Sequence, residues 1–215
     1  MALTLHSAWR ATAPYRVRIG LALKGVEYDY HAIDLLAGQQ REPAYKAVNP
    51  QGLTPALDLG DGTVLAQSLA ILEWLEETRP QPPILPRSAL DRAIVRRMAG
   101  VIACDIHPLN NTRVGAKLRE LGVPDDVVVS DWIHRWIRDG FDALEPLVER
   151  HGGQFAFGDS PTIADCCLVP QVYSARRFKL DVRPWPALIG AADRAAEHPA
   201  FQAAHPNKQP DAKPV

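Results

Sequence analysis

The sequence predicts two domains, a small α/β domain followed by an all-helical one, and three observations support this. Residues 3–79 alternate between short apolar runs and helical spacing, in the order β-α-β and then β-β-α. A proline cluster typical of a domain boundary follows, at Pro80, Pro82, Pro83 and Pro86. Beyond Ser88 no strand pair is predicted. We therefore expect domains at residues 1–82 and 88–215.

The first three elements follow from apolar runs and their boundaries. Residues 3–7 read as a short apolar strand. A helix is predicted to begin at Pro14, because a proline in the first turn lacks an N–H that would be unpaired there anyway. Gly25 ends this helix. Residues 28–33 predict a second strand, which the helical crossover would place parallel to the first.

A hairpin and a further helix complete the predicted first domain. Residues 49–52 have the composition of a turn, and residues 55–66 predict two short strands around a Gly60-Asp61-Gly62 turn. Ser68 is expected to open the next helix as its N-cap residue, and the helix runs to about Arg79.

The second domain is predicted from helical spacing alone. Helical spacing is found in residues 89–121 and in residues 124–151, and another helix is expected near Thr162. Thr162 and Asp165 fit a capping box, with a hydroxyl at the cap and a carboxylate three residues later. Cys166 and Cys167 follow in this helix, where we expect packed core thiols. The segment after residue 206 is polar and reads as a loose tail.

Composition and charge exclude several classes of function. The net charge of −1 argues against a nucleic-acid partner, which requires a basic surface. No apolar stretch approaches the length of a membrane span, and no secretory signal is recognised. Cys104, Cys166 and Cys167 contain no C-x-x-C spacing, so neither disulfides nor a metal site are predicted. We expect a cytoplasmic protein without metal, membrane or nucleic acid.

Five ordered motifs carry a family resemblance. They are WRATAPYRVRI (9–19), NPQGLTPAL (49–57), Gln67-Ser68, CDIHPLNN (104–111) and ADCCLVPQV (164–172). In this combination the chain resembles the zeta-class glutathione transferases, a class that includes maleylacetoacetate isomerases and bacterial maleylpyruvate isomerases. The resemblance extends to about Pro199. It implies a thioredoxin-like first domain, a helical second domain, glutathione as cofactor and assembly as a homodimer.

The resemblance implies a set of glutathione contacts in the first domain. Thr12, just before the expected helix, would stabilise the thiolate, helped by the positive end of the helix. The family's loop cysteine is missing from Ala11-Thr12-Ala13, so thiol–disulfide chemistry is not expected. The other implied contacts are a cis Pro55 presenting the Thr54 main chain, Gln67 and Ser68 binding the γ-glutamyl carboxylate, and Gln40.

The second domain and three arginines complete the implied site. In the family, the segment of Asp105, His107, Asn111 and Arg113 reaches glutathione or substrate. Arginine pairs bidentately with carboxylates, so the remaining candidates for binding an acidic substrate are Arg10, Arg176 and Arg177. Arg177 aligns better than Arg176 with the family's substrate arginine, and the choice between them stays open.

The implied reaction is glutathione-dependent cis–trans isomerisation of a maleyl diacid to its fumaryl isomer, in the catabolism of aromatic compounds. The sequence does not choose between maleylpyruvate and maleylacetoacetate, although Cys104–Pro108 and Trp9-Arg10 favour the maleylpyruvate type slightly. Two alternatives remain. A transferase conjugating electrophiles would need no arginine clamp. A non-catalytic interaction module would be expected to have lost Thr12 and the Gln67-Ser68 pair, and both are present.

Overall fold

The computed structural model describes residues 2–213, which pack into two compact units. Within these residues, unit 1 comprises residues 2–84 together with residues 198–213, and unit 2 comprises Leu85–Glu197. The chain passes from one unit to the other at Ile84, within the proline-containing segment at residues 80–86. Residues 198–213 pack with unit 1, whereas the expected second domain spans residues 88–215.

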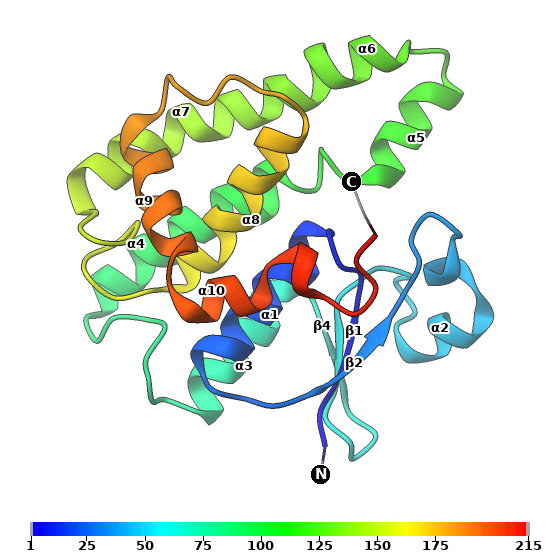
Figure 1. The fold of residues 1–215 in the computed structure, drawn as a ribbon, viewed down its shortest axis with the longest axis horizontal. Helices are drawn as coiled ribbons and strands as arrows, with labels where there is room; N and C mark the ends of the chain where they lie inside the picture. The colour runs from blue at the N-terminus through cyan, green and yellow to red at the C-terminus, as the bar shows by residue number, and fades with distance from the viewer. Residues whose placement is uncertain (1, 214–215) are drawn as a thin grey trace. The chain divides into compact units, whose positions relative to one another are not determined.

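Unit 1 contains a four-stranded sheet in the order β2-β1-β3-β4 (Figure 1). β1 (Thr4–Ser7) and β2 (Asp29–Ala32) are parallel, as predicted. β3 (Ala56–Asp58) and β4 (Val64–Ala66) form the predicted antiparallel hairpin, and β3 pairs with β1.

Two helices pack beside one another and contribute to one apolar core with the sheet. They are α1 (Thr12–Leu23) and α3 (Ser68–Thr78). Their buried side chains join those of β1 and β3 in a cluster formed by Leu3, Leu5, Val17, Leu21, Leu57, Ile71 and Leu75. This is the β-α-β and β-β-α arrangement of a thioredoxin-like domain.

The sequence missed the shorter helices of unit 1. They are η1 (Gln39–Arg41), α2 (Pro43–Val48), α10 (Pro199–Ala204) and η4 (Pro206–Lys208). α10 packs against α1. The predicted loose tail is therefore wrong for residues 206–213, since part of this segment is helical and Asp211 hydrogen-bonds to Trp9 and Tyr30.

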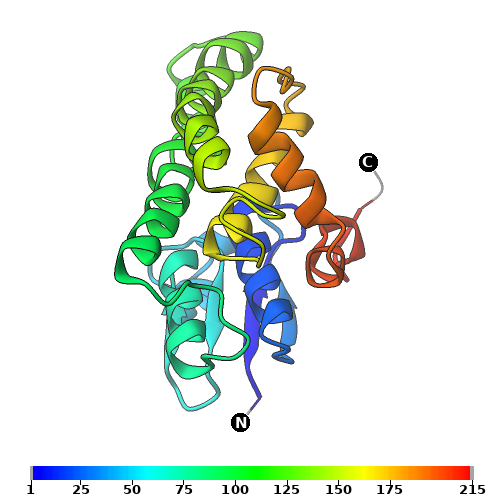
Figure 2. The same cartoon turned by 90° about the vertical axis from the view of Figure 1, so that its left-hand side faces the viewer.

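Unit 2 is helical throughout its regular structure, as predicted. Its longer helices are α4 (Ala89–Gly100), α5 (Thr112–Glu120), α7 (His134–His151), α8 (Ile163–Arg177) and α9 (Pro186–Ala196). Figure 2 shows α9 (orange) beside α8 (yellow), in agreement with Figure 1. Three shorter segments are the π-helical turns η2 (Val101–Ile106) and η3 (Val128–Ile133) and the single turn α6 (Asp125–Val127).

The start of α8 confirms two predictions. Thr162 and Asp165 form a complete capping box. Within the described residues Cys166 and Cys167 form no disulfide, and both are fully buried, so they are packed core thiols.

Candidate active site

One end of the unit 1 sheet gathers the predicted glutathione residues. The register pairs His6 with Ala56 and Ala56 with Ala66. Continuing both antiparallel pairings by one residue places Pro55 between Ser7 and Gln67 at this end of the sheet. Because Ser7 leads to α1 and Gln67 leads to α3, both helices begin at this end of the sheet.

The start of α1 has no capping side chain. Ala11 is the N-cap residue, with extended backbone angles and no side-chain hydrogen bond to the helix, and Thr12 is the first helical residue. The helix therefore begins two residues before the predicted start at Pro14, and Thr12 lies in its first turn rather than just before it. The N–H groups of Thr12 and Ala13 have no acceptor within the helix, as at any helix start, and Pro14 has no N–H. Thr12 itself is half-buried.

Buried Arg18 holds the loop that leads into α1. Its guanidinium donates to the carbonyl oxygens of Ala8 (3.4 Å) and Trp9 (2.6 Å), to Ser7 Oγ (3.0 Å) and to the Ala204 carbonyl (3.0 Å). Burial lowers the pKa of Arg18, while the nearby Tyr30 partly restores it. The loop conformation therefore depends on a buried charge of unit 1 that no local signal in the sequence predicts.

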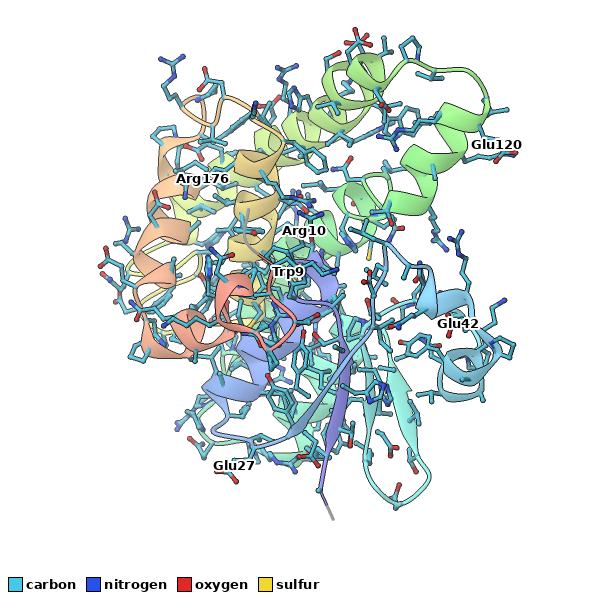
Figure 3. The ribbon with its side chains drawn as sticks, turned by 45° about the vertical axis from the view of Figure 1, so that its right-hand side comes forward. Trp9, Arg10, Glu27, Glu42, Glu120 and Arg176 are labelled. Atoms are coloured by element: carbon cyan, nitrogen blue, oxygen red, sulfur yellow. The ribbon has the colours of Figure 1, made fainter. Side chains whose placement is uncertain are left out.

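Asp211 binds the same loop from the C-terminal segment. The Trp9 N–H donates to Oδ2 (3.0 Å) and the Tyr30 hydroxyl donates to Oδ1 (2.7 Å). Arg10 lies over the Trp9 ring, 5.2 Å from its centroid. Figure 3 shows both side chains near the start of α1, at the end opposite Glu27.

The turn before Pro55 is fixed by two buried side chains. The Tyr45 hydroxyl and Asn49 Nδ2 both donate to the Leu53 carbonyl, each at 2.7 Å. Burial raises the pKa of Tyr45 to about 12, so its hydroxyl remains a donor. The predicted cis Thr54–Pro55 bond is confirmed.

Gln40 lies against this turn. A side chain at Gly52, which has a φ of +63°, would come within 2.9 Å of the Gln40 carbonyl oxygen. Glycine is therefore required by both the backbone angle and the close approach. The Gln40 side chain is half-buried, and its Nε2 is 3.5 Å from the Leu35 carbonyl.

The start of α3 resembles that of α1 and differs from the prediction by one residue. Gln67, rather than Ser68, is the N-cap residue, and it makes no side-chain cap hydrogen bond. Its φ of +69° is unusual for a residue with a side chain and stores backbone strain. Gln67 Nε2 donates to Gln51 Oε1 (2.8 Å). Ser68 is buried, and its Oγ accepts from Arg16 Nη1 at 3.2 Å.

Four predicted residues of unit 2 follow one another around a helix break. Asp105 is exposed and lies in η2, and His107 is half-buried just after it. Asn111 is the N-cap residue of α5, where its Oδ1 accepts from the Arg113 N–H (3.1 Å). The Arg113 side chain is exposed. Asn111 therefore has a structural task of its own.

The last turn of α8 distinguishes its two arginines. Arg176 makes a bidentate ion pair with Asp193, at 2.7 and 2.9 Å, and this hydrogen bonding raises the pKa of the guanidinium. Arg177 lies over the Phe178 ring, 4.8 Å from its centroid. The fork of donors on Arg176 is thus already directed at a carboxylate of the protein.

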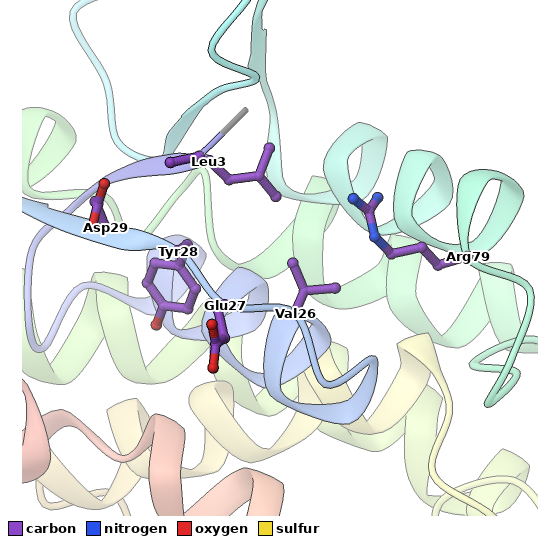
Figure 4. Close-up of a pocket in the computed structure, with 7 residues that line it drawn as sticks. Leu3, Val26, Glu27, Tyr28, Asp29 and Arg79 are labelled. Carbon is purple, nitrogen blue, oxygen red and sulfur yellow. The ribbon is translucent and has the colours of Figure 1, made fainter.

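A surface hollow of unit 1 contains none of the predicted residues. It is lined by Ala2, Leu3, Val26, Glu27, Tyr28, Asp29 and Arg79 (Figure 4). These residues lie where β1 and β2 begin and α3 ends, whereas the predicted residues lie where β1 ends and α3 begins. The hollow and the candidate site are therefore at opposite ends of unit 1.

Two further observations concern residues 2–213. No group of three or more His, Cys, Asp and Glu side chains is placed to hold a metal ion. No helix in this range combines the length and apolar character needed to cross a membrane.

Family models match both parts of the chain. The model of the glutathione S-transferase N-terminal domain matches residues 13–78, and that of the C-terminal domain matches residues 130–207. A maleylpyruvate isomerase from Ralstonia sp is 49% identical over 97% of this chain and 99% of its own length. A maleylacetoacetate isomerase from Pseudomonas aeruginosa is 46% identical over 97% of this chain and 98% of its own length.

Solved structures agree with the sequence relatives. The holo structure of a maleylpyruvate isomerase, described as a bacterial zeta-class glutathione S-transferase, has a TM-score of 0.95 and 46% identity, over 98% of this chain and 100% of that one. A maleylacetoacetate isomerase from Anaeromyxobacter dehalogenans, with dicarboxyethyl glutathione and citrate in its active site, has a TM-score of 0.89 and 44% identity, over 99% of this chain and 98% of that one. The chain therefore belongs to the glutathione S-transferase family, among relatives named maleylpyruvate and maleylacetoacetate isomerases.

Proposed function

We propose that the protein is a glutathione-dependent cis–trans isomerase that converts a maleyl diacid to its fumaryl isomer. The observation that carries the proposal is the meeting of two helix starts without capping side chains, α1 and α3, beside the cis Thr54–Pro55 turn. Free N–H groups and helix dipoles favour anions, and glutathione carries both a thiolate and carboxylates. The activity follows the named relatives, at 46–49% identity.

Bound glutathione supplies a thiolate that adds to the maleyl double bond, permits rotation about the resulting single bond and is then eliminated. The chain must keep this sulfur ionised. The Thr12 hydroxyl donates to it, and the N–H groups at the start of α1 add a favourable field. The half-buried position of Thr12 supports this role.

The main chain of Thr54 binds the cysteinyl part of glutathione. The Leu53 carbonyl is directed at Tyr45 and Asn49. In a trans peptide the carbonyl and the following N–H point in opposite directions, so the Thr54 N–H points away from these two side chains. Gln40 lies against the same turn and is proposed as a peripheral contact.

Gln67 and Ser68 bind the γ-glutamyl carboxylate at the start of α3. The positive φ of Gln67 supports this assignment, because strained backbone is concentrated at ligand sites. The Gln67 amide retains a carbonyl oxygen for the amino group, since its Nε2 donates to Gln51.

Arg10, Arg113 and Arg177 bind the substrate carboxylates and balance the charge that develops on the neighbouring carbonyl oxygen. We choose Arg177 over Arg176 because Arg176 already pairs bidentately with Asp193. Asp105, His107 and Asn111 are retained as contacts from unit 2. We further propose a cytoplasmic homodimer, whose oligomeric state light scattering would test, with a domain boundary between residues 82 and 88. Because residues 198–213 pack with unit 1, expression of residues 85–197 alone would test whether the second domain folds independently.

The deciding experiment follows the absorbance of maleylpyruvate and of maleylacetoacetate with purified enzyme, with and without glutathione. We expect glutathione-dependent formation of the fumaryl product from at least one substrate, and its loss in Arg177→Ala but not in Arg176→Ala. Conjugation of a model electrophile without isomerisation of either diacid would instead make the protein a general transferase. Failure to act on either diacid or on electrophiles would favour an interaction module.

A further inference from the structure

A buried arginine on α1 contacts the proposed carboxylate site from within unit 1. The Arg16 side chain is 1% exposed, and its Nη1 donates to Ser68 Oγ at 3.2 Å. Arg16 shares α1 with Arg18, and in the sequence both resemble ordinary charges beside the apolar Val17 and Ile19. Burying a guanidinium is costly unless its donors are used, so its position requires an explanation.

The packing of α1 against α3 determines which residue Arg16 meets. Three successive pairs lie along this contact, each separated by 52 positions in the sequence: Arg16 with Ser68, Gly20 with Leu72, and Lys24 with Glu76. A side chain at Gly20 would collide with Leu72. Lys24 and Glu76 form an ion pair at 2.6 Å with little exposure. The two helices are thus parallel and held in register, and Arg16 faces the first residue of α3.

The chemistry of the contact restricts the Ser68 hydroxyl. Arginine carries N–H donors and no acceptor, whereas a serine hydroxyl has one proton and two lone pairs. In the bond with Arg16, Ser68 can therefore only accept. Its own proton remains available for another acceptor, and donation from a cation polarises the hydroxyl toward giving that proton.

We propose that Arg16 is a positioning residue for glutathione recognition: it holds Ser68 as a hydrogen-bond donor toward the γ-glutamyl α-carboxylate at the start of α3. This inference rests on the proposed use of glutathione. Arg16 acts through Ser68, so its effect falls on the affinity for that one carboxylate. It does not act on the thiolate or on the rate of reaction at saturation.

The test compares glutathione with an analogue in which 4-aminobutyrate replaces the γ-glutamyl residue, which removes only the α-carboxylate. Dissociation constants of both ligands are measured by calorimetry for wild type and for Arg16→Met. A hydrogen bond to a charged group contributes about 1.5–3 kcal/mol, so we expect roughly a tenfold or greater loss of glutathione affinity. The affinity for the analogue should change little, and the maximal rate at saturating glutathione should be retained.

Two further variants separate positioning from general damage. In a Ser68→Ala background, Arg16→Met should have little additional effect, because the hydroxyl that it positions is gone. Lys24→Met removes another buried cation from the same helix contact, two turns away, and should lower stability while the ratio of the two affinities stays as in wild type. If Arg16→Met does not fold, Arg16→Gln takes its place. The ratio of glutathione affinity to analogue affinity is again expected to fall below the wild-type ratio.

The outcomes distinguish the inference from the proposed function. An Arg16 variant that folds and keeps the wild-type ratio of affinities overturns the inference alone. An equal loss of affinity for both ligands in that variant also overturns the inference, since the role of Arg16 would then be structural. Wild-type protein that binds neither ligand overturns the glutathione proposal itself.

Discussion

Helix starts in the two units differ in how their N–H groups are satisfied. In unit 2, α8 begins with Thr162, and the Asp165 carboxylate accepts from the N–H groups of Thr162 and Ala156 and from the Thr162 hydroxyl. α9 has no cap of its own, yet Glu145 accepts from the N–H groups of Ala187 and Leu188, both at 2.8 Å. These starts are closed by the oxygens of the protein.

In unit 1, the starts of α1 and α3 are open in this respect, because neither Ala11 nor Gln67 offers a side-chain oxygen to its helix within the described residues. Capping normally contributes about 1 kcal/mol, so an open start gives up stability that α8 keeps. Under the proposed function, the open starts of α1 and α3 serve an external anion, whereas the closed starts of α8 and α9 serve only the fold. The proposed glutathione site lies at the open pair.

The largest expected effect comes from opening the closed start. Asp165→Ala leaves three buried donors without their acceptor, which we expect to lower the free energy of unfolding by about 3 kcal/mol or more. Urea denaturation of wild type and variant would measure it. Glutathione affinity per folded molecule should be unchanged, and a selective loss of that affinity would contradict the comparison.

The same carboxyl predicts a pH dependence. Burial raises the pKa of Asp165 to about 6 from its ordinary value of 3.8, although hydrogen bonds from Ala156 and Thr162 act in the opposite direction. Because the native pKa is the higher one, its stabilising contribution is full below pH 3.8 and is lost as the pH rises through about 6.

Each pKa unit corresponds to about 1.36 kcal/mol, so this contribution is on the order of 2–3 kcal/mol. The stability of wild type minus that of Asp165→Asn should therefore fall between about pH 4 and pH 7. A difference that stays constant or grows over that range, in urea titrations at each pH, would show that the carboxyl is ionised throughout.

At the open start of α1, Thr12→Ala removes the proposed donor to the thiolate. A hydrogen bond to a charged group is worth about 1.5–3 kcal/mol, so kcat/KM near neutral pH should fall roughly 10- to 100-fold. The pKa of bound glutathione, followed by thiolate absorbance, should rise, and Thr12→Ser should restore both quantities. An unchanged thiol pKa would assign the stabilisation to the helix start alone.

The smallest expected effect comes from closing the open start. Ala11 already has the extended backbone of an N-cap residue, so Ala11→Asp should stabilise the protein by roughly 0.5–1 kcal/mol. The new carboxylate competes with the ligand for the same N–H groups, and glutathione affinity should fall several-fold. Thr162→Ala is the matched control, with lower stability and unaltered affinity. Greater stability at full affinity would mean that the start of α1 does not serve glutathione.

Local signals in the sequence predicted much of this molecule. The β-α-β and β-β-α order, the Gly60–Gly62 turn, the capping box at Thr162 and the packed thiols of Cys166 and Cys167 all depend on neighbouring residues, and the structure confirms them. Family motifs added the cis Pro55. The short helices α2 and α10 were missed, because about six residues carry too little periodicity to stand out.

The sequence by itself determined the fold class, the family and the candidate residues of the glutathione site. Only the tertiary structure decided that Ser68 follows an open helix start, that Arg16 faces Ser68, that Asp211 binds the Trp9 loop and that Arg176 pairs with Asp193. Helix and turn signals arise from residues a few positions apart. These contacts join residues from 17 to 202 positions apart, so they exist only once the helices and strands have packed.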